Sequence, residues 1–320
     1  TNMSLTISTA AAELRKKHPK TVSDAAAANA SALLRGARGN SGVILSLLFR
    51  GFAKAVKDKD VIDGRELAIA LDFGVAAAYK AVMKPAEGTI LTVSRLAAAR
   101  AAEATPNDPE AVLEAAIAEG QLALENTINQ NPVLKKAGVV DAGGKGFLVI
   151  LQGMLDSMRG LPLPEESGDH AKPEQKTDYA AIAAEEITFT FDTVFIVRKT
   201  TRKSLEAFQA YLNSIGDSLV IGEDDDAFKV HVHTDIPGAA LTEAQKYGTL
   251  ELAKIENMRT QAEDLAAGRH IQSTDDLEEA DHSHAGRNVA PPEKRYGVVA
   301  VAAGAGLAEE HILACLSSAP

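Results

Sequence analysis

The spacing of apolar residues changes partway along this chain, and the change limits the fold to at least two kinds of domain. Between residues 4 and 159, apolar side chains recur every three to four positions, with no alternating β-branched segment between them. This pattern predicts an all-α domain of about seven helices over residues 1–160. The predicted helices are Leu5–Lys17, Val22–Leu34, Val43–Val56, Gly64–Met83, Thr89–Ala104, Pro109–Asn126 and Gly144–Met158.

Residues 178–267 carry a different pattern, in which short alternating or β-branched segments flank two helical ones. The order β-α-β-β-α-β predicts a ferredoxin-like α+β domain, with a four-stranded sheet and two helices on one of its faces. The predicted strands are 188–197, 218–221, 227–233 and 250–255, and the predicted helices are 205–212 and 238–247.

Two segments, 161–177 and 268–294, are rich in charged residues and proline and are typical of linkers. After the second linker, an apolar strand pattern and a helical pattern predict the start of an α/β domain over residues 295–320. One strand and one helix cannot bury a core alone, and the chain opens on Thr-Asn-Met. We therefore expect the chain to be truncated at both ends.

Composition excludes several classes of function. The net charge is −11, and no lysine and arginine cluster forms a stripe with aromatic residues, which argues against a nucleic acid partner. No apolar run approaches about 18 uncharged residues, so no membrane span is expected. The one cysteine, Cys315, rules out an internal disulfide framework and favours a reducing, cytoplasmic location.

The segment Gly36-Ala37-Arg38-Gly39-Asn40-Ser41-Gly42 lies between two predicted helices and is the first candidate binding site. Its glycines allow a ligand to approach the backbone, and the free N–H groups of the following helix would point toward a bound phosphate. It lacks the Lys-Ser/Thr of a Walker loop, and no strand precedes it. The alternative is an ordinary turn between two helices.

Two further predicted helix starts also have sequences that suit anion binding. Asp141-Ala142-Gly143-Gly144 precedes the last helix of the α domain, and Gly88-Thr89-Ile90 precedes an earlier one. Each could be a simple helix start capped by Asp141 or Thr89. Together with the first loop, however, they predict an anion-binding rim where several helix N-termini meet.

A possible metal site lies on the third predicted strand of the α+β domain. His231 and His233 share one face of that strand, with Val230 and Val232 on the other, and paired imidazoles suit zinc. A pair of surface histidines is the alternative. Asp235 is a further possible ligand, although a helix cap is the stronger interpretation. His282 and His284 fit a solvated linker better than a metal site.

Five segments together carry a resemblance to a known family. They are GARGNSGVILS, PAEGTILTV, NPVLKKAGVVDAGGKG, KVHVHTDIPG and KIENMRTQ. The chain resembles the catalytic subunit of bacterial fatty acid kinase, a relative of the ATP-binding L subunit of dihydroxyacetone kinase. The resemblance implies a helical barrel of the dihydroxyacetone kinase L-subunit type that binds ATP at one rim.

The resemblance also implies where the ligands bind. Magnesium ions would bridge the ATP phosphates, held by aspartates of an Asp-Gly-Asp-Thr-Gly-x-Asn-Met motif. Only the end of that motif is present, as Thr1-Asn2-Met3, so the metal-binding aspartates are expected upstream of Thr1. An arginine that the relatives place before the last motif is missing between Leu124 and Leu134. The implied ATP-binding residues are Asn2, Met3, Gly39, Asn40, Ser41, Gly42, Thr89, Ile90, Asp141, Ala142 and Gly143.

For the α+β domain, the resemblance adds a third metal ligand. Family members often carry a cysteine in the first strand, which we associate with the two histidines. Here Asp192 stands at that position, so a site of His231, His233 and Asp192 would still suit Zn²⁺ but would have lost its softer ligand.

The function that the resemblance implies is phosphoryl transfer. An ATP- and Mg²⁺-dependent kinase subunit would phosphorylate the carboxylate of a fatty acid held by a separate fatty-acid-binding protein of the DegV/FakB type. The acyl phosphate would supply phospholipid synthesis, the protein would form a homodimer, and the truncated chain would be inactive. The alternatives are a subunit of a glycerone (dihydroxyacetone) kinase and a non-catalytic nucleotide-binding or interaction module.

Overall fold

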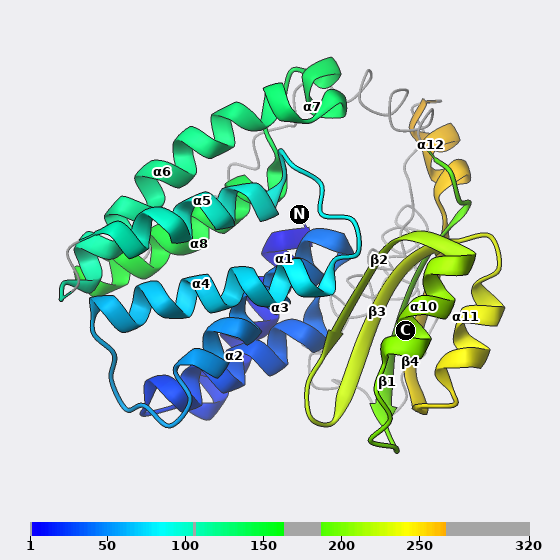
Figure 1. Ribbon diagram of the computed structural model, residues 1–320, viewed down its shortest axis with the longest axis horizontal. Helices are drawn as coiled ribbons and strands as arrows, with labels where there is room; N and C mark the ends of the chain where they lie inside the picture. Colours follow the sequence, from blue (N-terminus) through cyan, green and yellow to red (C-terminus); the bar gives the residue numbers. More distant parts are fainter. Residues whose placement is uncertain (1, 105–106, 163–186, 267–320) are drawn as a thin grey trace, which may run out of the picture. The chain divides into compact units, whose positions relative to one another are not determined.

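A computed structural model describes residues 2–104, 107–162 and 187–266 of the chain (Figure 1). Several expectations lie outside the described residues. These are Thr1, most of the first predicted linker, the acidic linker with His282 and His284, and the predicted α/β start with Cys315.

The N-terminal part of the described chain is entirely helical, as the apolar spacing predicts. It contains one helix more than expected, because the six residues of α7 are too few to show a period. The helices are α1 (Asn2–Lys17), α2 (Val22–Gly36), α3 (Gly39–Ala55), α4 (Gly64–Ala81), α5 (Ile90–Glu103), α6 (Pro109–Gln130), α7 (Pro132–Ala137) and α8 (Ala142–Met158).

Local sequence signals set several of these helix boundaries. Asp63 and Glu66 form a reciprocal capping box at the start of α4. Asp108 caps α6 through the backbone N–H of Glu110, and Pro109 occupies its first turn, as the sequence predicts. In the part of the chain that the structure describes, no helix combines the length and apolarity needed to cross a bilayer.

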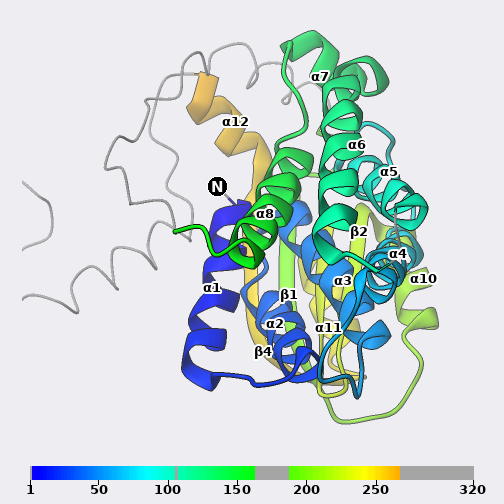
Figure 2. The ribbon, with the colours of Figure 1, turned by 90° about the vertical axis from the view of Figure 1, so that its left-hand side faces the viewer.

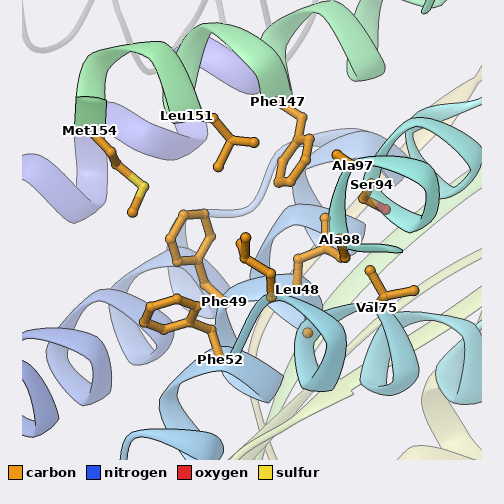
Figure 3. A pocket seen from close by; sticks show the side chains of 12 residues that line it. Leu48, Phe49, Phe52, Val75, Ser94, Ala97, Ala98, Phe147, Leu151 and Met154 are labelled. Carbon is orange, nitrogen blue, oxygen red and sulfur yellow. The ribbon is translucent and has the colours of Figure 1, made fainter. Parts of the chain in front are cut away.

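Helices α5, α6 and α8 run side by side (Figures 1 and 2). Their alanine and leucine side chains join those of α3 and α4 in one core. One apolar pocket at this core has a volume of about 20 Å³, which is room for roughly one water molecule. Aromatic and aliphatic side chains surround it, including Phe49, Phe52, Phe147 and Met154 (Figure 3).

The second part of the described chain is a small antiparallel sheet with helices. Its order is β1, α10, β2, β3, α11, β4, followed by a helix, α12, that the sequence did not predict. The strands lie in the order β2-β3-β1-β4, and each neighbouring pair is antiparallel. The bounds are β1 (Phe191–Lys199), α10 (Glu206–Ile215), β2 (Gly216–Glu223), β3 (Ala227–Thr234), α11 (Pro237–Ala244), β4 (Gly248–Asn257) and α12 (Met258–Ala266).

The two faces of the sheet are both covered. Phe195, Phe228 and Val230 pack on one face with Phe208 of α10 and Ala240 of α11. The other face meets the helical part of the chain, since α3 contacts both β2 and β3. Val220 of β2 belongs to the core of the helices rather than to that of the sheet. A Cβ atom at Gly222 would lie only 2.8 Å from Leu34 Cδ1, so β2 and α2 approach closely at this point.

Candidate functional site

The N-terminal ends of α1, α3, α5 and α8 meet at one place, which we call the rim. A Cβ atom at Gly143 of α8 would lie 3.0 Å from Ser41 Oγ of α3 and 3.4 Å from Ile90 Cβ of α5. A Cβ atom at Gly146 would lie 3.1 Å from Met3 Cβ of α1. The segments that the sequence predicted to form a rim are therefore brought together.

The first turn of α3 is the glycine-rich loop itself. The sequence placed the start of this helix at Val43, whereas the helix begins at Gly39, and Gly39 has the positive φ of 58° that favours glycine. Arg38 stands at the N-cap position without a side-chain cap hydrogen bond. The Oδ1 atom of Asn40 is buried and has no hydrogen-bond partner among the described residues. An anion can bind at the N–H groups of an uncapped helix start, and its counterion can bind at the buried oxygen beside it.

At the start of α5, Thr89 is a helix cap, as the alternative interpretation held. Its Oγ1 accepts a hydrogen bond from the backbone N–H of Leu91 at 3.3 Å and donates one to the carbonyl of Ala86 at 2.8 Å. The preceding turn is held by Glu87, which accepts hydrogen bonds from Thr92 Oγ1 at 2.8 Å and from Arg95 at 3.0 Å. Thr89 and Ile90 thus sit on a firmly held turn at the edge of the rim.

At the start of α8, Asp141 is also a cap, accepting a hydrogen bond from the N–H of Gly144 at 2.7 Å. Burial raises the pKa of this carboxyl, although hydrogen bonds from the backbone of Gly144 and Ile90 partly offset that effect. Because those two N–H groups belong to α8 and α5, Asp141 links two of the helix starts. Ala142 opens α8 between Asp141 and Gly143.

Sequence reasoning missed two residues that support the rim from behind. The Oγ1 atom of Thr6 in α1 accepts a hydrogen bond from Arg38 N at 3.0 Å. Lys229 of β3 donates hydrogen bonds to the carbonyls of Arg35 and Ala37. Thr6 lies in none of the segments that carry the family resemblance, and Lys229 opens one of them, KVHVHTDIPG, which gave it no role. Both contacts join positions far apart in the chain, so no local signal predicts them.

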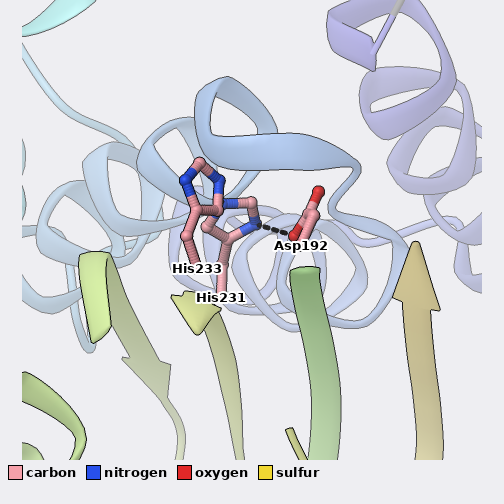
Figure 4. Close-up of side chains that lie close together, drawn as sticks. All are labelled: Asp192, His231 and His233. Carbon is pink, nitrogen blue, oxygen red and sulfur yellow. Dashed lines mark hydrogen bonds and ion pairs between the residues drawn. The ribbon is translucent and has the colours of Figure 1, made fainter. Parts of the chain in front are cut away.

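The second candidate site is a cluster of Asp192, His231 and His233 on the sheet (Figure 4). Asp192 of β1 stands opposite His233 of β3 in the strand register. The Nε2 atoms of the two histidines are 3.2 Å apart, and His231 Nδ1 lies 3.4 Å from Asp192 Oδ1. Val230 and Val232 face the opposite side and are fully buried there, as the alternation predicts.

The environment of the cluster keeps its imidazoles neutral. Burial, with smaller contributions from the charges of His233 and Lys229, lowers the pKa of His231 to about 3. Burial also lowers the pKa of His233, while Asp217 acts in the opposite direction. Neutral imidazoles are the form that binds metal ions.

The expectation that Asp235 caps the following helix is wrong. Its Oδ1 accepts a hydrogen bond from the backbone N–H of Thr190 at 2.8 Å, and the N-cap of α11 is Ile236, without a side-chain cap. Asp235 therefore ties the start of the sheet domain to the end of β3, and it lies outside the metal-ligand cluster.

Comparison with known protein families agrees with this two-part architecture. A model described as the DAK2 domain matches residues 1–156, and a model of the FakA-like fatty acid kinase middle domain matches residues 188–265. The chain belongs to the family that joins these two domains, which confirms the resemblance drawn from its motifs and indicates a kinase-related role.

Individual relatives point the same way. Protein YloV of Bacillus subtilis (strain 168) is 39% identical over 325 residues, covering 97% of this chain and 56% of that protein. Uncharacterized protein SH1689 of Staphylococcus haemolyticus (strain JCSC1435) is 39% identical over 289 residues, covering 87% of this chain and 52% of that protein. The chain thus spans about half the length of the curated relatives it matches.

Proposed function

We propose that the rim binds the phosphates of ATP and that the chain is part of a kinase. The observation that carries this proposal is the convergence of four helix N-termini around an uncapped first turn of α3. Each helix start contributes N–H donors and the positive end of a helix dipole, which together favour a polyphosphate. The rim residues would then be those implied by the family resemblance.

A magnesium ion also fits the rim. The buried Asn40 Oδ1 is an acceptor, so it cannot donate to a phosphate, and an oxygen ligand of this kind suits a hard divalent cation. The aspartates that the family uses for this purpose would lie upstream of Thr1. When bound, the ion would supply the positive charge that phosphoryl transfer requires.

The substrate that fits best is a carboxylate presented by another protein. A fatty acid carboxylate is already ionised at neutral pH, so its attack on a phosphoryl group needs no general base. The apolar pocket lined by Phe49, Phe147 and Met154 has a volume of about 20 Å³, which is far too small for an acyl chain (Figure 3). A fatty-acid-binding partner of the DegV/FakB type would therefore hold the lipid, and the product would be an acyl phosphate.

Other features of the proposal follow from the family resemblance. The helical part would be an antiparallel barrel of the dihydroxyacetone kinase L-subunit type. The strand order and connections support a ferredoxin-like assignment for the sheet domain. The protein would act as a cytoplasmic homodimer.

Nucleotide binding can be tested with Asn40→Ala. We expect the variant to bind Mg-ATP about tenfold more weakly than the parent in calorimetry, since it removes a polar group facing the ligand. Asn107→Ala is the matched control, because Asn107 is exposed beyond the opposite end of α5. Equal affinities for the two variants would show that ATP does not bind at the rim.

The reaction itself can be tested with a chain that carries a complete Asp-Gly-Asp-Thr-Gly-x-Asn-Met motif. We expect ATP consumption with a fatty-acid-loaded binding protein and none with dihydroxyacetone. Turnover of dihydroxyacetone alone would favour the glycerone kinase alternative. ATP binding without turnover of either substrate would favour the non-catalytic module.

We also propose that Asp192, His231 and His233 hold a Zn²⁺ ion. Their ligand atoms lie within 4.8 Å of one another, and both imidazoles are held neutral. The ion would cross-link β1 and β3. Zinc analysis of His231→Ala against the parent tests the site, and equal zinc contents would exclude it.

A further inference from the structure

Lys229 is a lysine buried between the sheet and the helices. Its side chain extends from β3, only 3% of the residue is exposed, and its Nζ donates hydrogen bonds to Ala37 O at 2.5 Å and Arg35 O at 3.2 Å. Burying an ammonium group carries a large desolvation cost, which the two carbonyls must offset. A lysine buried at this cost indicates that its ammonium group is needed at a fixed position.

The two carbonyls belong to the end of α2. That helix ends at Gly36, with Ala37 as its C-cap, so Arg35 and Ala37 lie where carbonyls lack helical partners and the dipole is negative. A lysine ammonium complements this end of the helix in both charge and hydrogen bonding.

The same turn leads directly into the first turn of α3. Only Arg38 separates Ala37 from Gly39, and the N–H of Arg38 donates to Thr6 Oγ1 at 3.0 Å. The turn is therefore fixed from two sides, by Lys229 of the sheet and by Thr6 of α1. Its position determines where the N–H groups of Gly39, Asn40 and Ser41 point, while the N–H of Gly42 donates to the carbonyl of Arg38 at 3.1 Å.

We propose that Lys229 is a positioning residue for the phosphate-binding turn of α3, through which the sheet domain sets the affinity of the rim for nucleotide. This inference rests on the proposed function of the rim. The hydrogen bonds of Lys229 to Arg35 and Ala37 go to carbonyls behind the turn.

The test uses Lys229→Met, which keeps the length of the side chain and removes its donors, and Lys229→Arg, which restores charge and donors. We expect Lys229→Met to weaken Mg-ATP binding about tenfold in calorimetry, with Lys229→Arg closer to the parent. Lys199→Met is the matched control, since Lys199 also bonds to a carbonyl, that of Asp224, but within the sheet domain. Its nucleotide affinity should equal that of the parent.

Hydrogen exchange distinguishes positioning from general damage. In Lys229→Met, the amides of residues 38–42 should exchange faster, while those at the starts of α5 and α8 keep the protection of the parent. Unchanged exchange at residues 38–42, or an equal loss of affinity in Lys199→Met, would overturn the proposal. If Lys229→Met does not fold, Thr6→Val tests the turn from its other side and should give the same local signature.

The two proposals fail separately. If the parent chain binds no ATP, the function of the rim is refuted, and faster exchange at residues 38–42 in Lys229→Met would then show a turn held by Lys229 without a nucleotide role. If the parent binds ATP and Lys229→Met binds it equally well, only the role of Lys229 is refuted.

Discussion

At the scale of single residues, the rim depends on close approaches that only glycine permits. Gly143 and Gly153 both belong to α8, but they differ in their surroundings. A Cβ atom at Gly143 would crowd Ser41 Oγ at 3.0 Å, whereas one at Gly153 would meet nothing within 4 Å. A side chain at Gly143 would thus force a neighbour to shift, whereas one at Gly153 would not.

This contrast makes a prediction about two similar substitutions. Gly143→Ala should weaken Mg-ATP binding about tenfold, because the added methyl pushes α3 and α8 apart at the rim. Gly153→Ala should leave binding unchanged and raise the free energy of unfolding by about 0.5–1 kcal/mol, since alanine is the better helix former. Calorimetry and urea unfolding measure the two effects. Tighter or unchanged ATP binding by Gly143→Ala would contradict the packing argument.

A second prediction at this scale concerns the metal ligands. Asp192→Cys should raise the affinity for Zn²⁺ about tenfold or more, because a thiolate is a softer ligand than a carboxylate. Asp192→Asn is the matched variant of equal size without charge, and it should bind Zn²⁺ more weakly than the parent. Competition with a chromogenic chelator gives the three constants. A cysteine variant no tighter than the asparagine variant would show that residue 192 does not contact the ion.

At the scale of elements, apolar spacing predicted the helices because the side chains that pack into the core recur with the period of the helix. The exceptions have physical causes. The first turn of α3 was predicted as a loop because glycine and asparagine are poor helix formers, but Gly39 and Gly42 lie closely against Asn2 and Thr6 of α1, and Thr6 also accepts a hydrogen bond from the preceding Arg38 N–H. Helix α7 is too short to show a period. Asp235 resembles a cap in sequence, yet Thr190 competes for its carboxylate.

The prediction at this scale concerns Asp141, the N-cap residue of α8. Asp141→Ala should lower the free energy of unfolding by about 1 kcal/mol, because the N–H of Gly144 loses its acceptor. Asp141→Asn should stay within about 0.5 kcal/mol of the parent, since asparagine is an equally good cap. Urea unfolding of both variants measures the difference. Equal losses would mean that the charge of Asp141, rather than its cap hydrogen bond, stabilises α8.

At the scale of the whole described chain, the sheet supports the helical domain. The helices and the sheet of the described residues belong to one compact unit, and Lys229 reaches a carbonyl 192 positions earlier in the chain. No local pattern could predict that contact, because strand alternation shows which residues share a face but not what that face meets. The family resemblance located the rim from motifs, but it said nothing of the residues behind it.

Val220 provides the last prediction, because it lies on β2 but packs in the core of the helices. Val220→Ala should cost about 2 kcal/mol of stability and speed hydrogen exchange in both β2 and the adjoining helix α3. Val230→Ala is the matched control, since Val230 is equally apolar and buried but packs inside the sheet domain. It should speed exchange in the sheet strands and leave α3 as protected as in the parent. If α3 also stayed fully protected in Val220→Ala, the contact between the sheet and the helices would not stabilise the fold. The sheet would then be no firm support from which Lys229 could hold the rim in position.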